Sequence, residues 1–374
     1  MKGQKSFENL AKERRKTMSK KRKMLGKLVS VGVVISFVAL IGISSVLAKE
    51  ITIRMGNVDS PFELTLTKAN GEFASTDIKC QAFKKIVEEI SHGTINVKIF
   101  PAGQLGGERE MLEMTKMGSL EMNGCSAAPL ASFVPEVMAV QIPYMFKDEN
   151  VALEVLNGPV GEELNELIVK KMGMRIFRWA YEGYYNIGTT KKPIRVPADL
   201  KGMKIRVSET PNLLEILKLA GGVPTPIPFT EVYTSVQQGV VDGAMTGIGL
   251  HYTIKTHELI KYYNVSNMWF GWSPIAVNEK FYRSLTPEEQ YWVKDAALKA
   301  MRVYQGMYFW GNDLWVELFK QRGIQVYLPN AKEMDEWVKT VKEPMIQWTK
   351  KQIGVEWVDK FLKASQDTEK RLYK

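Results

Sequence analysis

The chain has 374 residues, of which 45% are apolar, and it carries a formal net charge of +10. This length and composition are typical of a folded globular protein with two lobes. Residues 1–48 hold eleven of the 51 Lys and Arg residues but only two of the 41 Asp and Glu residues, which leaves 40 basic and 39 acidic side chains elsewhere. Because the excess positive charge belongs to this segment, the rest of the protein is nearly neutral and lacks the basic surface that binds nucleic acids. We therefore expect no nucleic-acid partner.

Residues 1–48 are predicted to be a secretory signal peptide, which indicates a periplasmic protein. A basic run ending at Lys27 precedes 21 uncharged residues, which end in the sequence VLA. We expect cleavage before Lys49. Serine and glycine residues dilute the apolar run and favour cleavage, but a run of this length also suits an uncleaved membrane anchor. The 17 residues before Met18 are unusually many for such a segment, so Met18 is an alternative start.

Strands and helices are expected to alternate through the first half of the mature chain. Strands are indicated by runs that alternate apolar and polar residues, and helices by apolar residues three or four positions apart. The expected elements are strands at 51–55, 94–100, 120–123, 174–180 and 185–189, and helices at 76–90, 106–117, 150–156 and 160–171.

The middle of the chain repeats this alternation. A strand at 204–207 is followed by a helix at 211–219, and a proline-rich connector at 224–228 leads into a helix at 229–238. Another strand is expected at 240–245. Such alternation predicts an α/β protein with sheets of the parallel type.

One long helix is expected to begin at Pro287. Thr286 supplies a capping hydroxyl and Glu289 stands at the third helical position, so the two residues form a capping box, with proline at the first helical position. No clear helix breaker follows until Gly323, although two earlier glycines allow a bend. A helix longer than about 25 residues usually connects structural units, and here it would tie two lobes together.

The sequence lacks the usual signs of catalysis or metal binding. Its three histidines, His92, His251 and His257, have no metal-ligand spacing, and there is no nucleophile elbow or phosphate-binding glycine loop. We therefore predict no enzyme activity, no cofactor and no metal. Cys80 and Cys125 lie 45 residues apart without a recognisable pattern, so both a disulfide and two buried thiols remain open.

Five segments, in order along the chain, closely resemble the DctP family of extracytoplasmic solute-binding proteins, which serve tripartite ATP-independent periplasmic (TRAP) transporters. These segments are 100–109 (FPAGQLGGER), 135–136 with 142–144 (PE and IPY), 197–207 (PADLKGMKIRV), 224–233 (PTPIPFTEVY) and 238–243 (QGVVDG).

The resemblance implies a two-lobed periplasmic-binding-protein-like α/β fold with a hinge, crossing strands and a long inter-lobe helix. It places lobe 1 at 49–181 and about 272–310, and lobe 2 at about 182–271 and 311–374. The 57–80 segment is longer than is usual for the family. Two interpretations of it remain open: a lid over the cleft entrance and a peripheral loop.

Arg206 is the main candidate for ligand binding. In the family, the arginine of this motif binds the carboxylate of the ligand, and a planar guanidinium offers two parallel donors that match two carboxylate oxygens. Phe229 stands where family members place an aromatic ring against the ligand. Core packing is the alternative for Phe229, and a solvated strand end is the alternative for Arg206.

The chain departs from the family at three positions that would contact the carboxylate. Asn186 replaces a second arginine, Thr246 falls where the family has asparagine, and Met268 replaces a histidine. The site therefore loses a formal charge and at least one amide.

Aromatic residues are expected to take over part of the pocket. Tyr185 and Trp269 are candidates on the two crossing segments, and Ser126 follows the strand expected at 120–123. Glu209, three residues after Arg206, would favour a zwitterion or amine if it reaches the ligand; capping the helix at 211–219 is the alternative.

The sequence thus predicts a binding protein that captures a small organic acid, with an aromatic or zwitterionic monocarboxylate as a possible form, and delivers it to the membrane permease subunits of a TRAP transporter. A binding protein of an ABC-type importer, a ligand sensor and a secreted enzyme on the same scaffold are the alternatives.

Overall fold

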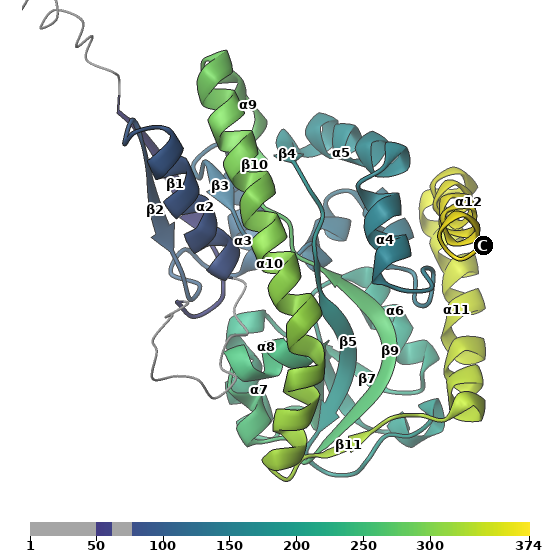
Figure 1. Cartoon of the computed structure of the whole chain (residues 1–374). Helices are drawn as coiled ribbons and strands as arrows, with labels where there is room; N and C mark the ends of the chain where they lie inside the picture. Colours follow the sequence, from purple (N-terminus) through teal and green to yellow (C-terminus); the bar gives the residue numbers. More distant parts are fainter. Residues whose placement is uncertain (1–49, 62–76) are drawn as a thin grey trace, which may run out of the picture. The chain divides into compact units, whose positions relative to one another are not determined.

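A computed structural model of the chain describes residues 50–61 and 77–374. The predicted signal peptide and most of the 57–80 segment lie outside the described residues, so the predictions made for them are untested. Residues Ile51–Lys374 form one compact unit, in which helices cover two β-sheets (Figure 1).

The first sheet has five strands in the order β2-β1-β3-β10-β4. The strand β1 runs parallel to β2 and β3, whereas β10 runs antiparallel to β3 and β4. Their bounds are β1 Ile51–Gly56, β2 Ile95–Phe100, β3 Met122–Asn123, β4 Met174–Ile176 and β10 Ala276–Asn278.

The second sheet has six strands in the order β11-β9-β5-β8-β6-β7. Parallel pairs join β6 to β7, β6 to β8 and β9 to β11, while β5 is antiparallel to both β8 and β9. The bounds are β5 Tyr181–Thr189, β6 Lys204–Val207, β7 Val223–Pro226, β8 Gly243–Gly247, β9 Tyr262–Trp272 and β11 Gln325–Tyr327. The α/β class is confirmed, but both sheets are mixed, so the expectation of parallel-type sheets is wrong for β5, β9 and β10.

Two strands carry the chain between the sheets. Residues 177–180 separate β4 from β5, and residues 273–275 separate β9 from β10. The long strands β5 and β9 pair along most of their length, with irregularities between Tyr181 and Tyr184 and between Tyr185 and Ile187. The chain enters the second sheet through β5 and leaves it through β9, so these two neighbouring strands run in opposite directions and that sheet is mixed. The returning strand β10 is likewise antiparallel to β3 and β4 in the first sheet.

The helix α10 (Pro287–Gln321) is continuous over 35 residues, as the capping signal predicts. Thr286 accepts a hydrogen bond from the Glu289 amide, and the Glu289 carboxylate accepts one from the Thr286 amide. Its first half packs on α2 (Asp77–Ile90), which covers β2 of the first sheet, and later turns contact α8 (Ile248–Thr253) and the strands β5 and β11 of the second sheet (Figure 1).

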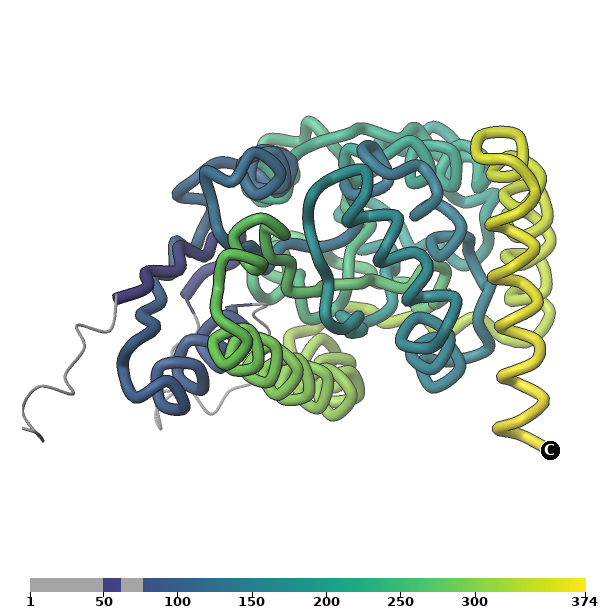
Figure 2. The backbone as a smooth tube through the Cα atoms, turned by 90° about the horizontal axis from the view of Figure 1, so that it is seen from above, coloured from purple at the N-terminus to yellow at the C-terminus, as the bar shows by residue number. Residues whose placement is uncertain are grey.

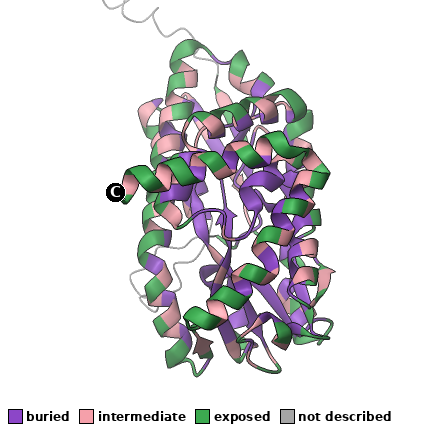
Figure 3. Ribbon diagram, turned by 90° about the vertical axis from the view of Figure 1, so that its right-hand side faces the viewer, coloured by how far each residue is buried: buried purple, intermediate pink, exposed green. Residues whose placement is uncertain are grey.

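The remaining helices cover the sheets from outside. Figure 3 shows their inward faces and the strands buried and their outward faces exposed. They are α3 Glu108–Met117, α4 Glu149–Leu156, α5 Pro159–Met172, α6 Pro211–Leu219, α7 Val232–Gln237, α9 Glu279–Ser284, α11 Ala331–Ile353 and α12 Val355–Leu372, with short 3-10 helices that include Ala128–Ser132, Pro135–Gln141 and Phe229–Glu231.

The carboxyl-terminal helices α11 and α12 (yellow in Figure 2) run in different directions, since Figure 1 shows α11 along its length and α12 nearly end-on. The helix α11 packs on α6, whereas α12 packs on α4 and α5. The predicted boundaries place α12 in lobe 2 and α4 and α5 in lobe 1, so α12 contacts elements on both sides of that division. The exact lobe boundaries remain a prediction.

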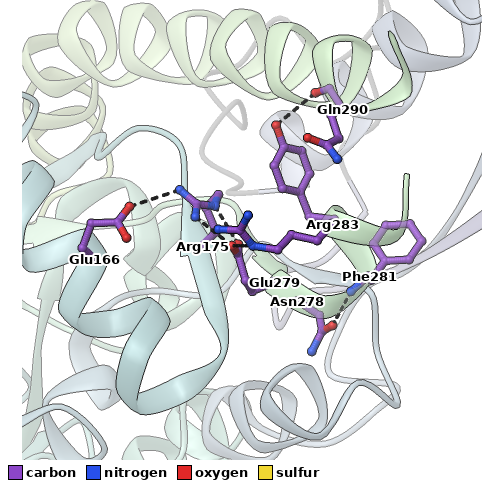
Figure 4. A network of polar contacts seen from close by, with 8 residues as sticks. Glu166, Arg175, Asn278, Glu279, Phe281, Arg283 and Gln290 are labelled. Carbon is purple, nitrogen blue, oxygen red and sulfur yellow. Dashed lines mark hydrogen bonds and ion pairs between the residues drawn. The ribbon is translucent and has the colours of Figure 1, made fainter. Parts of the chain in front are cut away.

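A charged network fixes the edge of the first sheet (Figure 4). Arg175 on β4 donates to Glu279 through Nε at 2.6 Å and Nη2 at 2.8 Å, and Arg283 donates to the same carboxylate at 2.6 Å. Glu166 on α5 accepts from Arg175 at 3.4 Å, and Asn278 caps α9 through the Phe281 amide. The network joins β4, α5 and α9.

Candidate functional site

Two small adjoining pockets lie between the carboxyl ends of strands from the two sheets, a position where α/β proteins commonly bind ligands. Each has a cavity volume of about 10 Å³, about the room that one water molecule needs. A larger ligand therefore needs the two sides to separate as it enters. The lining residues are Val58, Asp59, Glu108, Arg109, Ser126, Pro129, Glu182, Tyr185, Arg206, Ser208, Glu209, Pro228, Phe229 and Leu250.

Arg206 lies on β6 and is 1% exposed. Its Nε donates to the Ile227 carbonyl at 2.9 Å, and its guanidinium carbon lies 5.8 Å from the centroid of the Phe229 ring. Among the described residues, no carboxylate lies within ion-pair distance of it. Burial lowers the pKa of Arg206, while Tyr185, Glu108 and Glu209 oppose that fall. A buried guanidinium that has no carboxylate beside it can offer its N–H donors to the two oxygens of a ligand carboxylate.

Aromatic rings form one wall of the site. Phe229 and Tyr185 line the pockets, and the Tyr185 ring packs edge-on against Trp269 with a centroid distance of 4.5 Å. Behind them, Phe270 and Trp272 on β9 stack at 5.8 Å. This arrangement agrees with the prediction that aromatic side chains replace polar ones near the crossing strands.

Acidic residues from the first sheet and from β5 face this wall. Asp59 follows β1, Glu108 begins α3, and Glu182 lies on β5. Glu108 accepts a hydrogen bond from the Ser126 amide at 2.8 Å, and Glu182 accepts one from the Tyr185 hydroxyl at 2.8 Å. The Asp59 Oδ1 atom is buried and has no hydrogen-bond partner in the described part of the chain.

Lys79 on α2 is fully buried beside these carboxylates. Its Nζ donates to the carbonyl and the hydroxyl of Ser273 and lies 4.9 Å from the centroid of the Tyr304 ring. Burial lowers the pKa of Lys79, and neighbouring acidic groups oppose that fall.

Burial also perturbs the acids. It raises the pKa of Glu108 to about 7, with a further rise caused by the Glu182 carboxylate. It raises the pKa of Asp59 well above its usual range, against the attraction of Lys79, and it raises the pKa of Glu182. Glu108 is therefore expected to exchange a proton near neutral pH.

The structure brings five of the nine predicted site residues together. Arg206, Phe229, Tyr185, Glu209 and Ser126 all line the two pockets. The other four candidates lie elsewhere, and their roles remain predictions: Asn186 lines a separate cavity, while Thr246, Met268 and Trp269 are buried outside the linings.

Asn186 and Tyr185 show how sensitive such a prediction is to register. Asn186 bonds with Asn267 on β9, accepting from the Asn267 amide at 2.7 Å, and faces a cavity of about 310 Å³. Its neighbour Tyr185 occupies the pocket wall instead. Adjacent residues of a strand point to opposite faces, so a shift of one position exchanges the two.

Sequence reasoning missed Asp59, Lys79, Glu108 and Glu182. Glu108 could have been selected from the sequence, because it lies in the 100–109 motif directly after two glycines at a helix start. The other three come from elements far apart in sequence and carry no local signal.

A larger cavity of about 850 Å³ lies away from Arg206. It is bounded by residues of α5, β4 and α12 and by Lys294, and most of its lining side chains are charged. Its wall includes Glu166 and Arg175 of the network in Figure 4. The chemistry that would select an organic acid is concentrated in the small pockets instead.

Other predictions can be judged from the described residues. Cys80 and Cys125 are buried free thiols, so they form no disulfide in this structure. Within residues 50–61 and 77–374, no helix is both long and apolar enough to span a membrane. The same residues contain no cluster of three or more His, Cys, Asp or Glu side chains that could hold a metal ion.

Comparison with known proteins gives consistent matches. The model of the family described as bacterial extracellular solute-binding protein, family 7 (DctP), matches residues 71–352. A solute-binding protein of Verminephrobacter eiseniae is 31% identical over 226 residues, which are 60% of this chain and 67% of that protein.

Two solved structures share the fold. The galactonate complex of a sugar acid binding protein from Advenella mimigardefordensis has a TM-score of 0.79 and 26% identity, covering 86% of this chain and 99% of that one. A TRAP periplasmic solute-binding protein from Sulfurospirillum deleyianum with bound succinate has a TM-score of 0.74 and 27% identity, covering 83% and 98%. The predicted resemblance and two-lobed fold class are confirmed.

Proposed function

We propose that this chain, which belongs to the DctP family of bacterial extracellular solute-binding proteins, captures a small organic acid outside the cytoplasm and delivers it to the permease of a TRAP transporter. The observation that carries the proposal is the buried Arg206 guanidinium, which lacks a carboxylate partner among the described residues and lies against an aromatic ring. The family consists of substrate-binding proteins, and we propose no catalytic step.

The favoured ligand is a monocarboxylate. Arg206 supplies one strong carboxylate site, whereas Asn186 and Met268 stand where a second arginine and a histidine would have been expected. The rings of Phe229 and Tyr185 offer apolar surfaces against which an apolar or aromatic portion of the ligand could pack once the cleft has opened. Related proteins have been solved with galactonate and with succinate, so the family scaffold accepts organic acids of different charge.

Capture requires the cleft to open and close. The pockets are too small for a sugar acid as they stand, and they are bounded by residues on both sides of the crossing strands. Closure on a ligand would pair the Arg206 charge and exclude water, and a permease that recognises the closed form would receive only loaded protein. Export through the predicted signal peptide belongs to this proposal; an ABC-type importer or a sensor would use the same closure.

The test begins with a thermal-shift screen of sugar acids, aromatic acids, hydroxy acids and amino acids, because a ligand that binds the folded state raises the melting temperature. For an acid that binds, Arg206→Ala should weaken the affinity by about 10²- to 10³-fold or more, since removing half of a buried ion pair costs about 3–5 kcal/mol.

Controls separate binding from folding. We expect the unliganded Arg206→Ala variant to melt close to the wild type, because loss of the bond to Ile227 is offset by removal of an unpaired buried charge. Arg302→Ala, an exposed change on α10, should leave affinity intact. Full affinity in Arg206→Ala would refute the anchor, and turnover of a bound acid would refute a purely binding role.

A further inference from the structure

The buried charges around the cleft do not balance. Four carboxylates withdrawn from water lie in or next to it (Asp59, Asp77, Glu108 and Glu182), against two buried cations, Lys79 and Arg206. Glu209 and Arg109 also line it but are exposed, and they add one charge of each sign. A bound monocarboxylate would add a further negative charge. Since uncompensated buried charge is costly, the occupied site needs positive charge from the ligand or protons from solution.

The carboxylates differ in how far the protein satisfies them. Asp77 accepts from Asn57 at 2.7 Å and from Gln81 at 3.0 Å, and Glu182 accepts from Tyr185 and Tyr304. These residues have assigned structural partners.

Asp59 and Glu108 are the exceptions. Asp59 is 2% exposed and lines the pocket, yet within residues 50–61 and 77–374 its Oδ1 atom has no hydrogen-bond partner. Glu108 accepts a hydrogen bond from the Ser126 amide and borders both pockets. A buried acceptor without a donor destabilises the protein, so a ligand group that donates to it gains affinity.

We infer that the ligand carries an ammonium group as well as a carboxylate, and that Asp59 and Glu108 receive the ammonium while Arg206 holds the carboxylate. This inference deepens the proposed function and rests on it. Glu108 borders both pockets and Arg206 borders one, so a small amino acid or a related zwitterion can contact both groups at once.

The aromatic wall supports a cationic group at this place. Tyr185 and Phe229 line the same pocket as Asp59, and the face of an aromatic ring attracts a cation. The wall excludes water, which strengthens the attraction between an ammonium and the two carboxylates.

The inference also predicts whether protons are released or taken up when the ligand binds. Burial raises the pKa of Glu108 to about 7, so this carboxyl is partly protonated near neutral pH, and burial also raises the pKa of Asp59. The titratable and charged groups around these two acids are Asp77, Lys79, Cys80, Cys125, Glu182, Tyr185 and Arg206, with Arg109 and Glu209 in the pocket that Glu108 also borders. The positive charge of an ammonium group would lower the pKa of both acids, so binding would release protons. A ligand with an uncharged hydroxyl in place of the ammonium brings only the negative charge of its carboxylate, which would raise the pKa of both acids, so binding would take up protons.

The experiment compares matched pairs of acids that differ only in an amino or a hydroxyl group: alanine with lactate, serine with glycerate, and phenylalanine with phenyllactate. Affinity and proton exchange are measured by calorimetry in two buffers of different ionisation heat at pH 7. We expect at least one amino acid to bind about 10-fold or more tighter than its hydroxy partner, with net proton release.

Variants assign the effect to residues. Glu108→Gln and Asp59→Asn should each reduce the preference for the amino acid to about 3-fold or less, while Glu110→Gln, an exposed change in the same helical turn as Glu108, should keep it. Measuring the ratio of two affinities on one folded variant removes the effect of any general loss of stability.

Each outcome decides the matter. Hydroxy acids that bind as tightly as their amino partners would overturn the inference, and so would amino acids that bind with net proton uptake. An Arg206-dependent affinity for the hydroxy acids would still leave the proposed function standing. A preference that survives both acidic variants would overturn the residue assignment. If neither these pairs nor any other organic acid binds, the proposed function itself fails.

Discussion

Gly271 on β9 offers a direct test of how the crossing strand positions the ligand site. A Cβ atom at this position would lie 2.5 Å from Tyr185 Cε1 and 2.6 Å from Glu182 Cγ. Ordinary van der Waals contact begins at 3.4 Å, so the two side chains would have to move by about 1 Å. Both are buried, and the Tyr185 hydroxyl donates to Glu182, so the displacement would disturb a pocket wall and a carboxylate together.

We therefore expect Gly271→Ala to cost about 1–3 kcal/mol, the usual penalty for overpacking a dense interior. Because Tyr185 lines the pocket, part of that cost should appear as a loss of ligand affinity of about 5- to 100-fold. Urea unfolding measures the first quantity, and calorimetry with an acid found in the screen measures the second.

The matched control is Gly306→Ala on α10. A Cβ atom there meets nothing within 4 Å, and alanine is favoured over glycine inside a helix by about 0.5–1 kcal/mol. This variant should gain stability and keep its affinity. The reasoning is refuted if Gly271→Ala matches the wild type in both unfolding midpoint and affinity.

Three further predictions concern stability and charge. Burial would raise the pKa of Glu279, but the hydrogen bonds from Arg175 and Arg283 outweigh it and lower that pKa, so Glu279→Gln should destabilise the protein at pH 7 by about 1–3 kcal/mol. That difference should shrink as pH falls below the unfolded pKa near 4.3 and vanish once pH lies below the lower folded pKa, and an equal gap at all pH values by urea unfolding would contradict it. Thr286→Ala should cost about 0.5–2 kcal/mol in the same assay through loss of the α10 cap, and an unchanged midpoint would count against the capping box. Burial lowers the pKa of His251 to about 3, so its imidazole NMR signals should not titrate between pH 5 and 8, and stability should decline as pH falls below about 6.5, where the unfolded chain binds a proton that the folded chain does not; titration near pH 6.5 would show that the ring is accessible.

Local sequence signals determined much of the secondary structure. The strand β6 and the helix α6 fall at the predicted residues, and α10 begins at the predicted cap and runs to Gln321. These features depend on side-chain periodicity, proline placement and capping hydroxyls, which act within a few residues and are therefore readable in one sequence. The position of Arg206 in its motif likewise identified a residue that the fold buries.

The direction of the strands was decided by tertiary structure. Whether β5 pairs parallel or antiparallel depends on where the chain enters the second sheet, and the alternation of strands and helices does not contain that information. The same applies to α12, whose contacts with α4 join segments about 200 residues apart.

The chemical character of the cleft also emerged only in three dimensions. The sequence pointed to one arginine and a group of aromatic residues, and it selected both Asn186 and Tyr185, of which the pleat of β5 presents only Tyr185 to the small pockets. Asp59, Lys79, Glu108 and Glu182 come from the end of β1, two different helices and a crossing strand, and each looks like an ordinary surface charge by itself. Folding removes these charges from water and places them in the same region as Arg206, and the binding role that we propose for Asp59 and Glu108 depends on that change of environment.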